Sequence, residues 1–281
     1  MKQKNNLKNF TEYLILPILV VTSMALTFLS GCTGSMLENC SSNNNEIDNL
    51  DYVSFCAKEA TGENRIYFSY PHFMKTVTNS EELNELVEGF VVSALNDMLE
   101  GRFTGNIKSD TEYWIWNNDD YTKQAMQINF KIMRNDNNFV SIVFEGLCNY
   151  KGAAHPTHYF NSLTIDIKKC ELVVLSDLYR IDTDFVELVQ KKYKEQIRQD
   201  LATKTGVPIE MIAEFFEESF SVSSEKFLFE VLCQTGAIDR NTELCFFLTD
   251  TALGISIPVP YTLGNHYELL IPFNELEPFI M

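Results

Sequence analysis

His155 and His158 are the residues whose type and spacing most suggest chemistry. A His-x-x-His pair can present two imidazoles to a metal ion, but a zinc site needs a third and commonly a fourth ligand, with carboxylates that hold the imidazoles in place. Asp166 and Asp177, further along the chain, are the carboxylates that could complete such a set. Short motifs of this kind match by chance in many proteins, so we expect no metal ion here.

A structural role explains the same histidine more simply. Pro156 follows His155 directly and predicts a turn in place of a helix. We predict that Gly152 takes a backbone conformation in this turn that is closed to other residues. His155 is expected to hold the turn through a hydrogen bond to a backbone group or to a carboxylate, for which Asp166 and Asp177 are the candidates.

No catalytic constellation is recognisable elsewhere in the chain. Asp177 lies in Leu175-Ser176-Asp177-Leu178, which is typical of a turn or a helix cap. Asp119-Asp120 and Glu217-Glu218 are typical of solvated surfaces. The chain has no Gly-x-Ser-x-Gly nucleophile elbow, no Gly-x-x-x-x-Gly-Lys-Ser/Thr loop and no His-Glu-x-x-His. We therefore predict no catalytic residue, no metal and no cofactor, although paired catalytic carboxylates would leave no such motif.

The N-terminus has the parts of an export signal. Lys2, Lys4 and Lys8 make a positive start, and Leu14 to Phe28 follows as fifteen residues without a charge. This stretch is short for a membrane-spanning helix, which needs about 20 apolar residues. Leu29-Ser30-Gly31-Cys32 comes next and resembles the bacterial lipobox, in which small residues fit the signal peptidase and the cysteine thiol carries the lipid.

The lipobox predicts where the protein is located. We expect residues 1–31 to be a signal peptide, Cys32 to be lipidated, and the folded part to lie on the extracytoplasmic side of the cell membrane. An uncleaved anchor with a chance cysteine is the alternative. Residues 32–59 contain Ser41-Ser42-Asn43-Asn44-Asn45 and are assigned to a flexible polar tether.

Six further cysteines could form disulfides outside the cytoplasm. None belongs to a Cys-x-x-Cys unit, so neither redox chemistry nor a zinc ribbon is indicated. The sequence does not choose among the pairings that six cysteines allow, and several of them fall in apolar segments where a free cysteine serves as a small apolar residue. They are Cys40, Cys56, Cys148, Cys170, Cys233 and Cys245.

The chain is strongly acidic, with 22 Lys and Arg residues against 39 Asp and Glu residues and a formal charge of −17. Loss of residues 1–31 removes three lysines and one glutamate, which brings the charge to −19. Such a field repels phosphate backbones and anionic headgroups and attracts cationic partners. Nucleic-acid binding is therefore not expected. The hydrophobic content of 45% is enough for a sizeable core.

Hydrophobic periodicity predicts an α+β fold with antiparallel strands and segregated helices beyond the tether. The domain is assigned to residues 60–281, with halves at 60–135 and 136–281. Strands are predicted at 66–73, 124–133, 139–148, 162–168, 244–249, 254–259 and 267–272. Short turn signals make the segments 124–133, 139–148 and 162–168 antiparallel neighbours.

Local signals place the ends of these elements. Pro71 suits an edge strand or a strand end. Thr78 and Glu81 fit a capping box for a helix that ends near Gly101. Asp184 is predicted to cap a second helix. A third helix is predicted to open at Pro208, and a short segment from Asn274 to close the chain.

Several weak motifs occur in a fixed order. They are Ser69-Tyr70-Pro71, Tyr150-Lys151-Gly152-Ala153-Ala154-His155, Ser162-Leu163-Thr164-Ile165-Asp166-Ile167, Leu175-Ser176-Asp177-Leu178-Tyr179, Phe247-Leu248-Thr249, Gly254-Ile255-Ser256-Ile257, Pro260-Tyr261-Thr262-Leu263-Gly264 and Ile271-Pro272-Phe273. Together they resemble the extracellular domain of RsiV-like anti-sigma factors, which also occurs beside some peptidoglycan deacetylases and in many lipoproteins. The resemblance covers residues 60–280.

Two departures limit what the resemblance implies. Ala153 replaces the second glycine of a Gly-Gly-Ala-His pattern, and Gly264-Asn265-His266 replaces a Pro-Tyr-Ala-x-Gly type of segment. RsiV itself binds lysozyme and is then cleaved to release a sigma factor. We expect no sigma-factor role here, because only a short charged segment precedes the hydrophobic stretch of this chain.

The residues and the resemblance together predict a cell-surface lipoprotein with a non-enzymatic binding domain for a cell-wall glycan or a cationic protein such as lysozyme. The alternative is a hydrolase or accessory domain that acts on peptidoglycan. Besides the membrane that holds the lipid, peptidoglycan or a cationic protein is the expected partner. The candidate binding residues are His155, Asp166, Asp177 and Tyr261.

Overall fold

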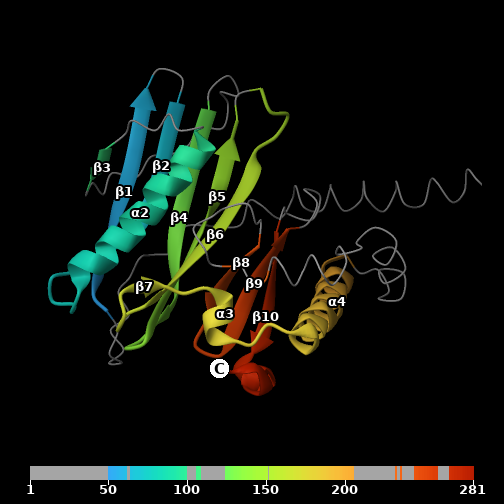
Figure 1. The fold of residues 1–281 in the computed structure, drawn as a ribbon. Coiled ribbons are helices and arrows are strands. Elements are labelled where there is room, and N and C mark those ends of the chain that lie inside the picture. Colours follow the sequence, from blue (N-terminus) through green and yellow to red (C-terminus); the bar gives the residue numbers. More distant parts are fainter. Residues whose placement is uncertain are drawn as a thin grey trace, which may run out of the picture.

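The chain forms a seven-stranded sheet and a three-stranded sheet, each accompanied by a long helix (Figure 1). The structure is a computed structural model, and it describes residues 50–61, 64–99, 106–108, 124–150, 152–205, 232, 235, 244–258 and 266–281. The strand order is β3-β1-β2-β4-β5-β6-β7 in the larger sheet and β10-β9-β8 in the smaller one. This is the α+β class that the sequence predicts.

The elements have the following bounds. The larger sheet consists of β1 (Tyr52–Thr61), β2 (Asn64–Phe73), β3 (Asn106–Lys108), β4 (Gln124–Asn135), β5 (Phe139–Asn149), β6 (Thr157–Asp166) and β7 (Glu171–Leu172). The smaller sheet consists of β8 (Cys245–Leu248), β9 (Ala252–Pro258) and β10 (His266–Pro272). The helices are α2 (Ser80–Met98), α3 (Leu175–Leu178), α4 (Thr183–Thr205), α7 (Phe273–Leu276) and the 3₁₀ helix η2 (Glu277–Phe279).

The prediction that three central strands are antiparallel neighbours is confirmed, because β5 pairs antiparallel with both β4 and β6. The turn between β4 and β5 is held by Asp136, whose carboxylate accepts hydrogen bonds from the backbone N–H groups of Asn138 and Phe139. Two boundaries differ from the expectation. β6 begins at Thr157 in place of residue 162, and most of β1 lies in residues 32–59, which were predicted to be a flexible tether.

Pro71 was predicted to mark an edge strand or a strand end. The edge position is not observed, because β2 lies between β1 and β4, but Pro71 does lie near the end of β2, which closes at Phe73. Its parallel pairing with β4 stops at Phe68, opposite Ile128. Beyond that point the Ser69 hydroxyl donates to the Ile128 carbonyl oxygen and accepts from the backbone N–H of Phe130. Pro71, which has no N–H, therefore lies where β2 has already left the β4 ladder.

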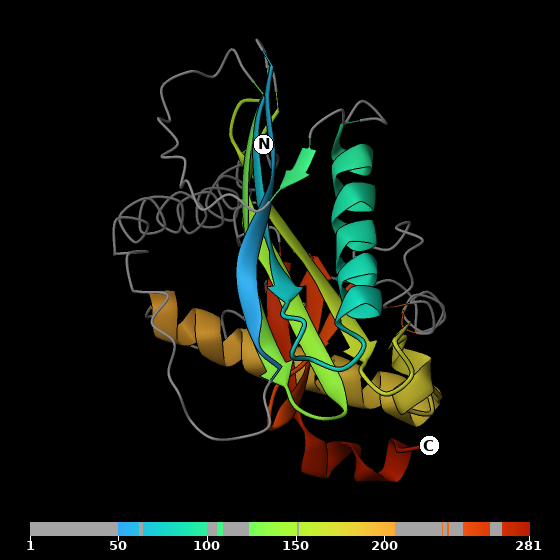
Figure 2. The same cartoon turned by 90° about the vertical axis from the view of Figure 1, so that its left-hand side faces the viewer.

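Helix α2 covers one face of the larger sheet (Figure 2). It stands in the chain between the parallel neighbours β2 and β4, which require such a crossover. Its buried residues recur at helical spacing and form one stripe against the sheet. They are Ser80, Leu83, Asn84, Val87, Phe90, Val91, Ala94 and Leu95.

The ends of the two long helices differ from the predicted ones. The capping box of Thr78 and Glu81 is not formed, because Asn79 occupies the cap position in a left-handed conformation with φ of 60° and makes no side-chain cap bond. Helix α2 ends at Met98, before the predicted end. Helix α4 is capped by Asp182, whose carboxylate accepts the backbone N–H of Phe185, and not by the predicted Asp184. The predicted helix at Pro208 lies outside the described residues.

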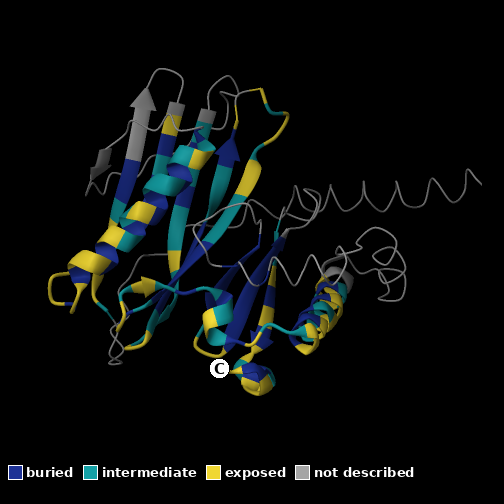
Figure 3. Cartoon of the chain, viewed as in Figure 1, coloured by how far each residue is buried: buried dark blue, intermediate teal, exposed yellow. Residues whose placement is uncertain are grey.

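Two apolar cores fill the layers between these elements (Figure 3). The first lies between α2 and the larger sheet and contains Phe68, Tyr70, Phe90 and Phe144. The second lies between α4 and the smaller sheet and is built from Phe185, Val186, Val189, Tyr193, Ile197, Phe246, Ile255, Leu269 and Ile271, with other apolar residues.

Strand β8 joins the two sheets through serine side chains. The hydroxyl of Ser162 donates to the carbonyl oxygen of Phe246, at 2.6 Å. The backbone N–H of Leu248 donates to the hydroxyl of Ser141, at 2.9 Å. Because side chains alternate along a strand, Ser141 and Ser162 lie on the face of the larger sheet opposite to α2. The backbone edge of β8 that does not pair with β9 is therefore satisfied by the larger sheet.

The described cysteines Cys56, Cys148, Cys170 and Cys245 form no disulfide with one another. Three of them are buried, as expected for small apolar residues. Cys32, Cys40 and Cys233 lie outside the described residues.

Within the described part of the chain, no helix is long and apolar enough to cross a membrane.

Candidate functional site

His155 lies in the predicted turn, but it is exposed. Its Nδ1 is 3.3 Å from the carbonyl oxygen of Pro156, the next residue. Gly152 has the predicted positive φ, at 82°. Gly152 thus has the predicted conformation, and His155 lies at the surface of the turn.

Asp166 and Asp177 have local roles at the far end of β6. The Asp166 carboxylate accepts the backbone N–H groups of Lys168 and Lys169 in the turn before β7. The Asp177 carboxylate accepts the backbone N–H of Val174 at the start of α3, which is the cap role that the sequence predicts.

The structure does not bring His155 and Asp166 together. His155 precedes the ten-residue strand β6 and Asp166 is its last residue, and at ~3.3 Å per residue this strand spans about 30 Å. Asp177 follows β7, which pairs with the Asp166 end of β6. Tyr261 lies outside the described residues. No group of three or more His, Cys, Asp or Glu side chains suited to a metal ion occurs among the residues that are described.

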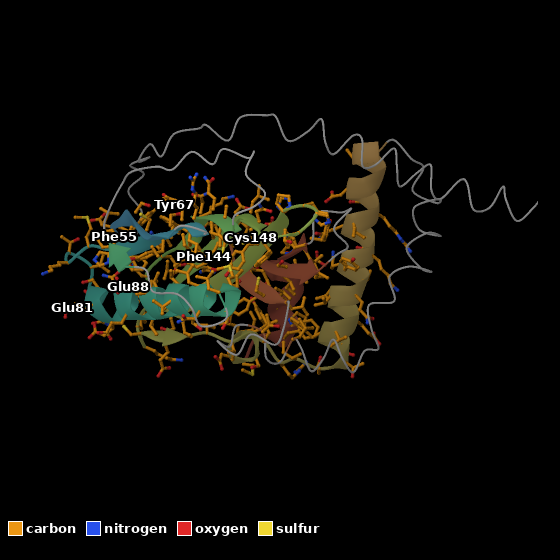
Figure 4. The ribbon with its side chains drawn as sticks, turned by 90° about the horizontal axis from the view of Figure 1, so that it is seen from above. Phe55, Tyr67, Glu81, Glu88, Phe144 and Cys148 are labelled. Carbon is orange, nitrogen blue, oxygen red and sulfur yellow. The ribbon has the colours of Figure 1, made fainter. Side chains whose placement is uncertain are left out.

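A different cluster forms where β1, β2 and α2 meet. The imidazole of His72 stacks on the ring of Phe55, with centroids 4.0 Å apart and planes 8° apart. Its Nδ1 lies 3.6 Å from a carboxylate oxygen of Glu88 on α2. Figure 4 shows Phe55 and Glu88 next to each other at the end of the layer between the sheet and α2. We call Phe55, Tyr70, His72 and Glu88 the β2–α2 corner.

Asn84 fixes which nitrogen of His72 carries the proton. Its Oδ1 accepts the backbone N–H of Phe73 at 2.7 Å, and its Nδ2 donates to the Phe73 carbonyl oxygen at 3.0 Å. These two bonds settle the orientation of the amide, so Nδ2 also faces His72 Nε2, at 3.4 Å. Nδ2 can only donate, so His72 Nε2 accepts and the proton of the neutral ring is on Nδ1, toward Glu88.

This tautomer argues against a catalytic His-Glu dyad. A dyad needs a free imidazole nitrogen to take a proton from a substrate or a nucleophile. In His72 that nitrogen is Nε2, and Asn84 already donates to it. The contacts of His72 with Asn84 and Glu88 therefore fix the position of the imidazole ring and do not form a proton-transfer pair.

Tyr70 lies beneath this pair. Its side chain is fully buried, the centroid of its ring lies 6.1 Å from that of Phe55 in an edge-on arrangement, and its hydroxyl has no hydrogen-bond partner among the described residues. Burial raises the pKa of Tyr70, and the nearby charge of Glu88 raises it further. The hydroxyl is therefore protonated and lies within electrostatic reach of the Glu88 carboxylate.

The outer surface of α2, next to the corner, is also acidic. The helix has no Lys or Arg, and its acidic side chains follow one another three or four residues apart along the first three turns. Glu81, Glu82 and Glu85 are exposed, and Glu88 is partly exposed. Like charges at these spacings destabilise a helix by about 0.2–0.5 kcal/mol a pair. Only the first turn is favoured by the helix dipole, so the charge of Glu85 lacks a local structural reason, whereas Glu88 contacts His72.

Sequence reasoning missed the corner, although one signal was present. The spacing of Glu81, Glu85 and Glu88 puts three carboxylates on one stripe of a helix whose apolar residues were identified. The contact of His72 with Phe55 was not predictable, because Phe55 lies in a strand within residues that the sequence assigns to the tether.

A second pair of histidines lies between the two sheets. His158 on β6 and His266 on β10 are close enough for charge repulsion to lower the pKa of His158, after burial as the larger cause. Glu145 on β5 acts in the opposite direction. The ring of His266 is 4.2 Å from that of Phe160, and its Nε2 is 3.8 Å from Glu268. This contact joins the sheets and is half open to solvent.

No known protein family matches the chain, and no curated protein does. The structure is similar to that of a DUF3298 family protein from Pseudomonas aeruginosa, with 14% identity and a TM-score of 0.52 over 83% of this chain and 95% of that one. It also aligns with a member of the same family from Bacteroides fragilis, with 13% identity and a TM-score of 0.39 over 83% and 94% of the two chains. The first comparison shows a shared fold, that of a bacterial domain of unknown function.

Proposed function

We propose that the protein is a lipid-anchored module of the cell surface that binds a cationic protein such as lysozyme through the acidic outer face of α2. One observation carries the proposal. Four glutamates within three helical turns stand without a single basic residue in the helix, at spacings that cost stability. A partner of opposite charge would remove this repulsion on binding.

Three further features support the same partner. The chain has a formal charge of −17, which raises the local concentration of cations around it. Exposed apolar side chains, Tyr52, Val53 and Met74, lie at the neighbouring ends of β1 and β2. Apolar groups next to charges are typical of protein interfaces. The resemblance to RsiV-like domains points to lysozyme in particular.

The test uses the full-length chain in phosphatidylcholine vesicles, with empty vesicles as the control. Lysozyme should sediment with the protein-bearing vesicles, and less of it should do so as salt is raised, because exposed charges are screened. Lysozyme with acetylated lysines should bind less, since acetylation removes the charge. Binding of purified peptidoglycan with no binding of lysozyme would overturn the proposal in favour of a glycan-binding protein.

A further inference from the structure

We propose that Gln196 of α4 closes the outer edge of β10 and so prevents a second copy of the chain from pairing with this strand. Helix α4 lies beside β10, which is the end strand of the smaller sheet (Figure 1). In the described part of the chain, β9 is the strand that pairs with β10. The inference concerns self-association and does not depend on the proposed partner.

The side-chain amide of Gln196 bonds to the backbone of β10 as a neighbouring strand would. Its Nε2 donates to the carbonyl oxygen of Leu270 at 2.6 Å, and its Oε1 accepts the N–H of the same residue at 3.1 Å. Two residues that lie opposite each other in an antiparallel pair exchange a donor and an acceptor in the same way. Gln196 therefore takes the place of one residue of a further strand.

These bonds show which backbone groups of β10 point away from the sheet. Leu270 lies opposite Gly254 of β9, but both of its backbone groups bond to Gln196, so they face outward. Hydrogen bonding alternates along an antiparallel strand, so the backbone groups of Glu268 and Pro272 face outward as well. Pro272 has no N–H, and Glu268 adds a charged, exposed side chain. Both features are typical of edge strands that are protected against pairing.

Two further contacts align α4 with β10. One turn before Gln196, the Nζ of Lys192 donates to the carboxylate of Glu275 at 2.8 Å. One turn after it, the carboxylate of Asp200 accepts the hydroxyl of Tyr267 at 2.9 Å. Side chains four residues apart lie along one side of a helix, so these three contacts form a row that holds Gln196 at the strand.

The other described sheet edges differ from that of β10. The edge of β8 is satisfied by Ser141 and Ser162 of the larger sheet. The end strands of the larger sheet, β3 and β7, have three and two residues, and edge strands as short as these seldom pair with another chain. Strand β10 has seven residues and exposes 42% of Leu270, so its edge needs protection.

A second copy of β10 fits this edge, because the strand is complementary to itself. Two β10 strands that pair antiparallel about Leu270 place the two leucines opposite each other, where their N–H and C=O groups exchange bonds. Each Glu268 then lies opposite Pro272 of the other strand, so the glutamates do not face each other. The exposed leucine side chains can pack across the pair. Gln196 prevents this pairing because it already uses both backbone groups of Leu270.

The test measures the oligomeric state of the full-length chain in detergent micelles by sedimentation velocity. Gln196→Leu removes the amide and keeps a side chain of similar size, so this variant should form dimers whose fraction rises with concentration. The unchanged chain should sediment as a monomer, and so should Gln199→Leu, the same substitution at an exposed position of α4. Gln196→Ala should dimerise like Gln196→Leu, and it serves as the test if the leucine variant does not fold.

A second substitution locates the contact. Leu270→Lys added to Gln196→Leu should restore the monomer, because two lysines would lie directly opposite each other across the pair. Dimers that persist in the double variant would show that another surface associates and would overturn the proposal. It would also be overturned if Gln196→Leu and Gln196→Ala stay monomeric and only melt at a lower temperature, since the amide would then do no more than attach α4 to the sheet.

Discussion

Gly146 and Gly89 show how the same substitution acts at two positions. A Cβ at Gly146 would lie 1.9 Å from the carbonyl oxygen of Gln127 and 2.7 Å from the Cα of Ile128. The backbone of β4 cannot move away without disrupting its pairing with β5, so Gly146→Ala should destabilise the fold by about 3 kcal/mol or more. A Cβ at Gly89 meets nothing within 4 Å in helix α2, so Gly89→Ala should stabilise it by about 0.5–1 kcal/mol. Urea unfolding measures both, and equal effects would contradict the packing described for β4 and β5.

Local roles of single residues could be predicted where they depend on neighbours in the chain. Gly152 has its predicted backbone conformation and Asp177 its predicted cap role, because both involve groups within a few residues. The proton position on His72 was out of reach. It depends on Asn84, twelve residues away, and on the pairing of that amide with the end of β2.

The backbone of strand β8 forms hydrogen bonds with side chains of the larger sheet. Ser141 accepts the N–H of Leu248 and bonds the hydroxyl of Thr164, both at 2.9 Å and fully or almost fully buried. Ser141→Ala leaves the N–H of Leu248 without a partner, which should lower the free energy of unfolding by about 1–3 kcal/mol. Chemical unfolding should show almost no change for Ser54→Ala, on the exposed part of β1. Equal stability of the two variants would mean that the bond to Leu248 contributes nothing.

Strands whose pairing depends on residues close in the sequence could be predicted, and those whose pairing joins distant segments could not. β4 and β5 show alternation and a short turn, so their pairing followed from the sequence. The parallel pairing of β2 with β4 did not, because it joins segments about 60 residues apart across helix α2. Pro71 was predicted to lie at an edge strand or a strand end, and only the second holds. That β2 is an inner strand and loses its pairing with β4 after Phe68 depends on the tertiary structure.

For the whole molecule, the contact between the sheets predicts a dependence of stability on pH. The pKa of His158 is lowered in the folded protein, so between about pH 6.5 and that lower value the unfolded chain binds more protons. The contribution of His158 is therefore complete above about pH 6.5 and is lost as pH falls through the folded pKa. Unfolding at pH 7.5 and pH 5.5 should show a smaller difference for His158→Gln than for the unchanged protein. The variant His155→Gln, outside this contact, should keep the full difference; an unchanged slope in His158→Gln would contradict the account.

The proposed location of the molecule rests on its N-terminus and can be tested independently of the fold. Cys32→Ser should abolish both labelling by a fatty-acid analogue and retention in the membrane fraction, because the thiol is the expected site of lipidation. Membrane retention of the variant, with residues 1–31 still attached, would show an uncleaved anchor in place of a lipoprotein.

The acidic outer face of α2 is the central claim, and one comparison tests it most directly. The affinity of the full-length chain for lysozyme is measured in phosphatidylcholine vesicles for two triple variants with the same change of charge. Replacing Glu81, Glu82 and Glu85 by Gln should weaken binding about tenfold, at up to about 1 kcal/mol for each exposed charge. Replacing Glu171, Glu187 and Glu277 by Gln should have a much smaller effect. Equal losses in both variants would show that only net charge matters and would contradict a binding face on α2.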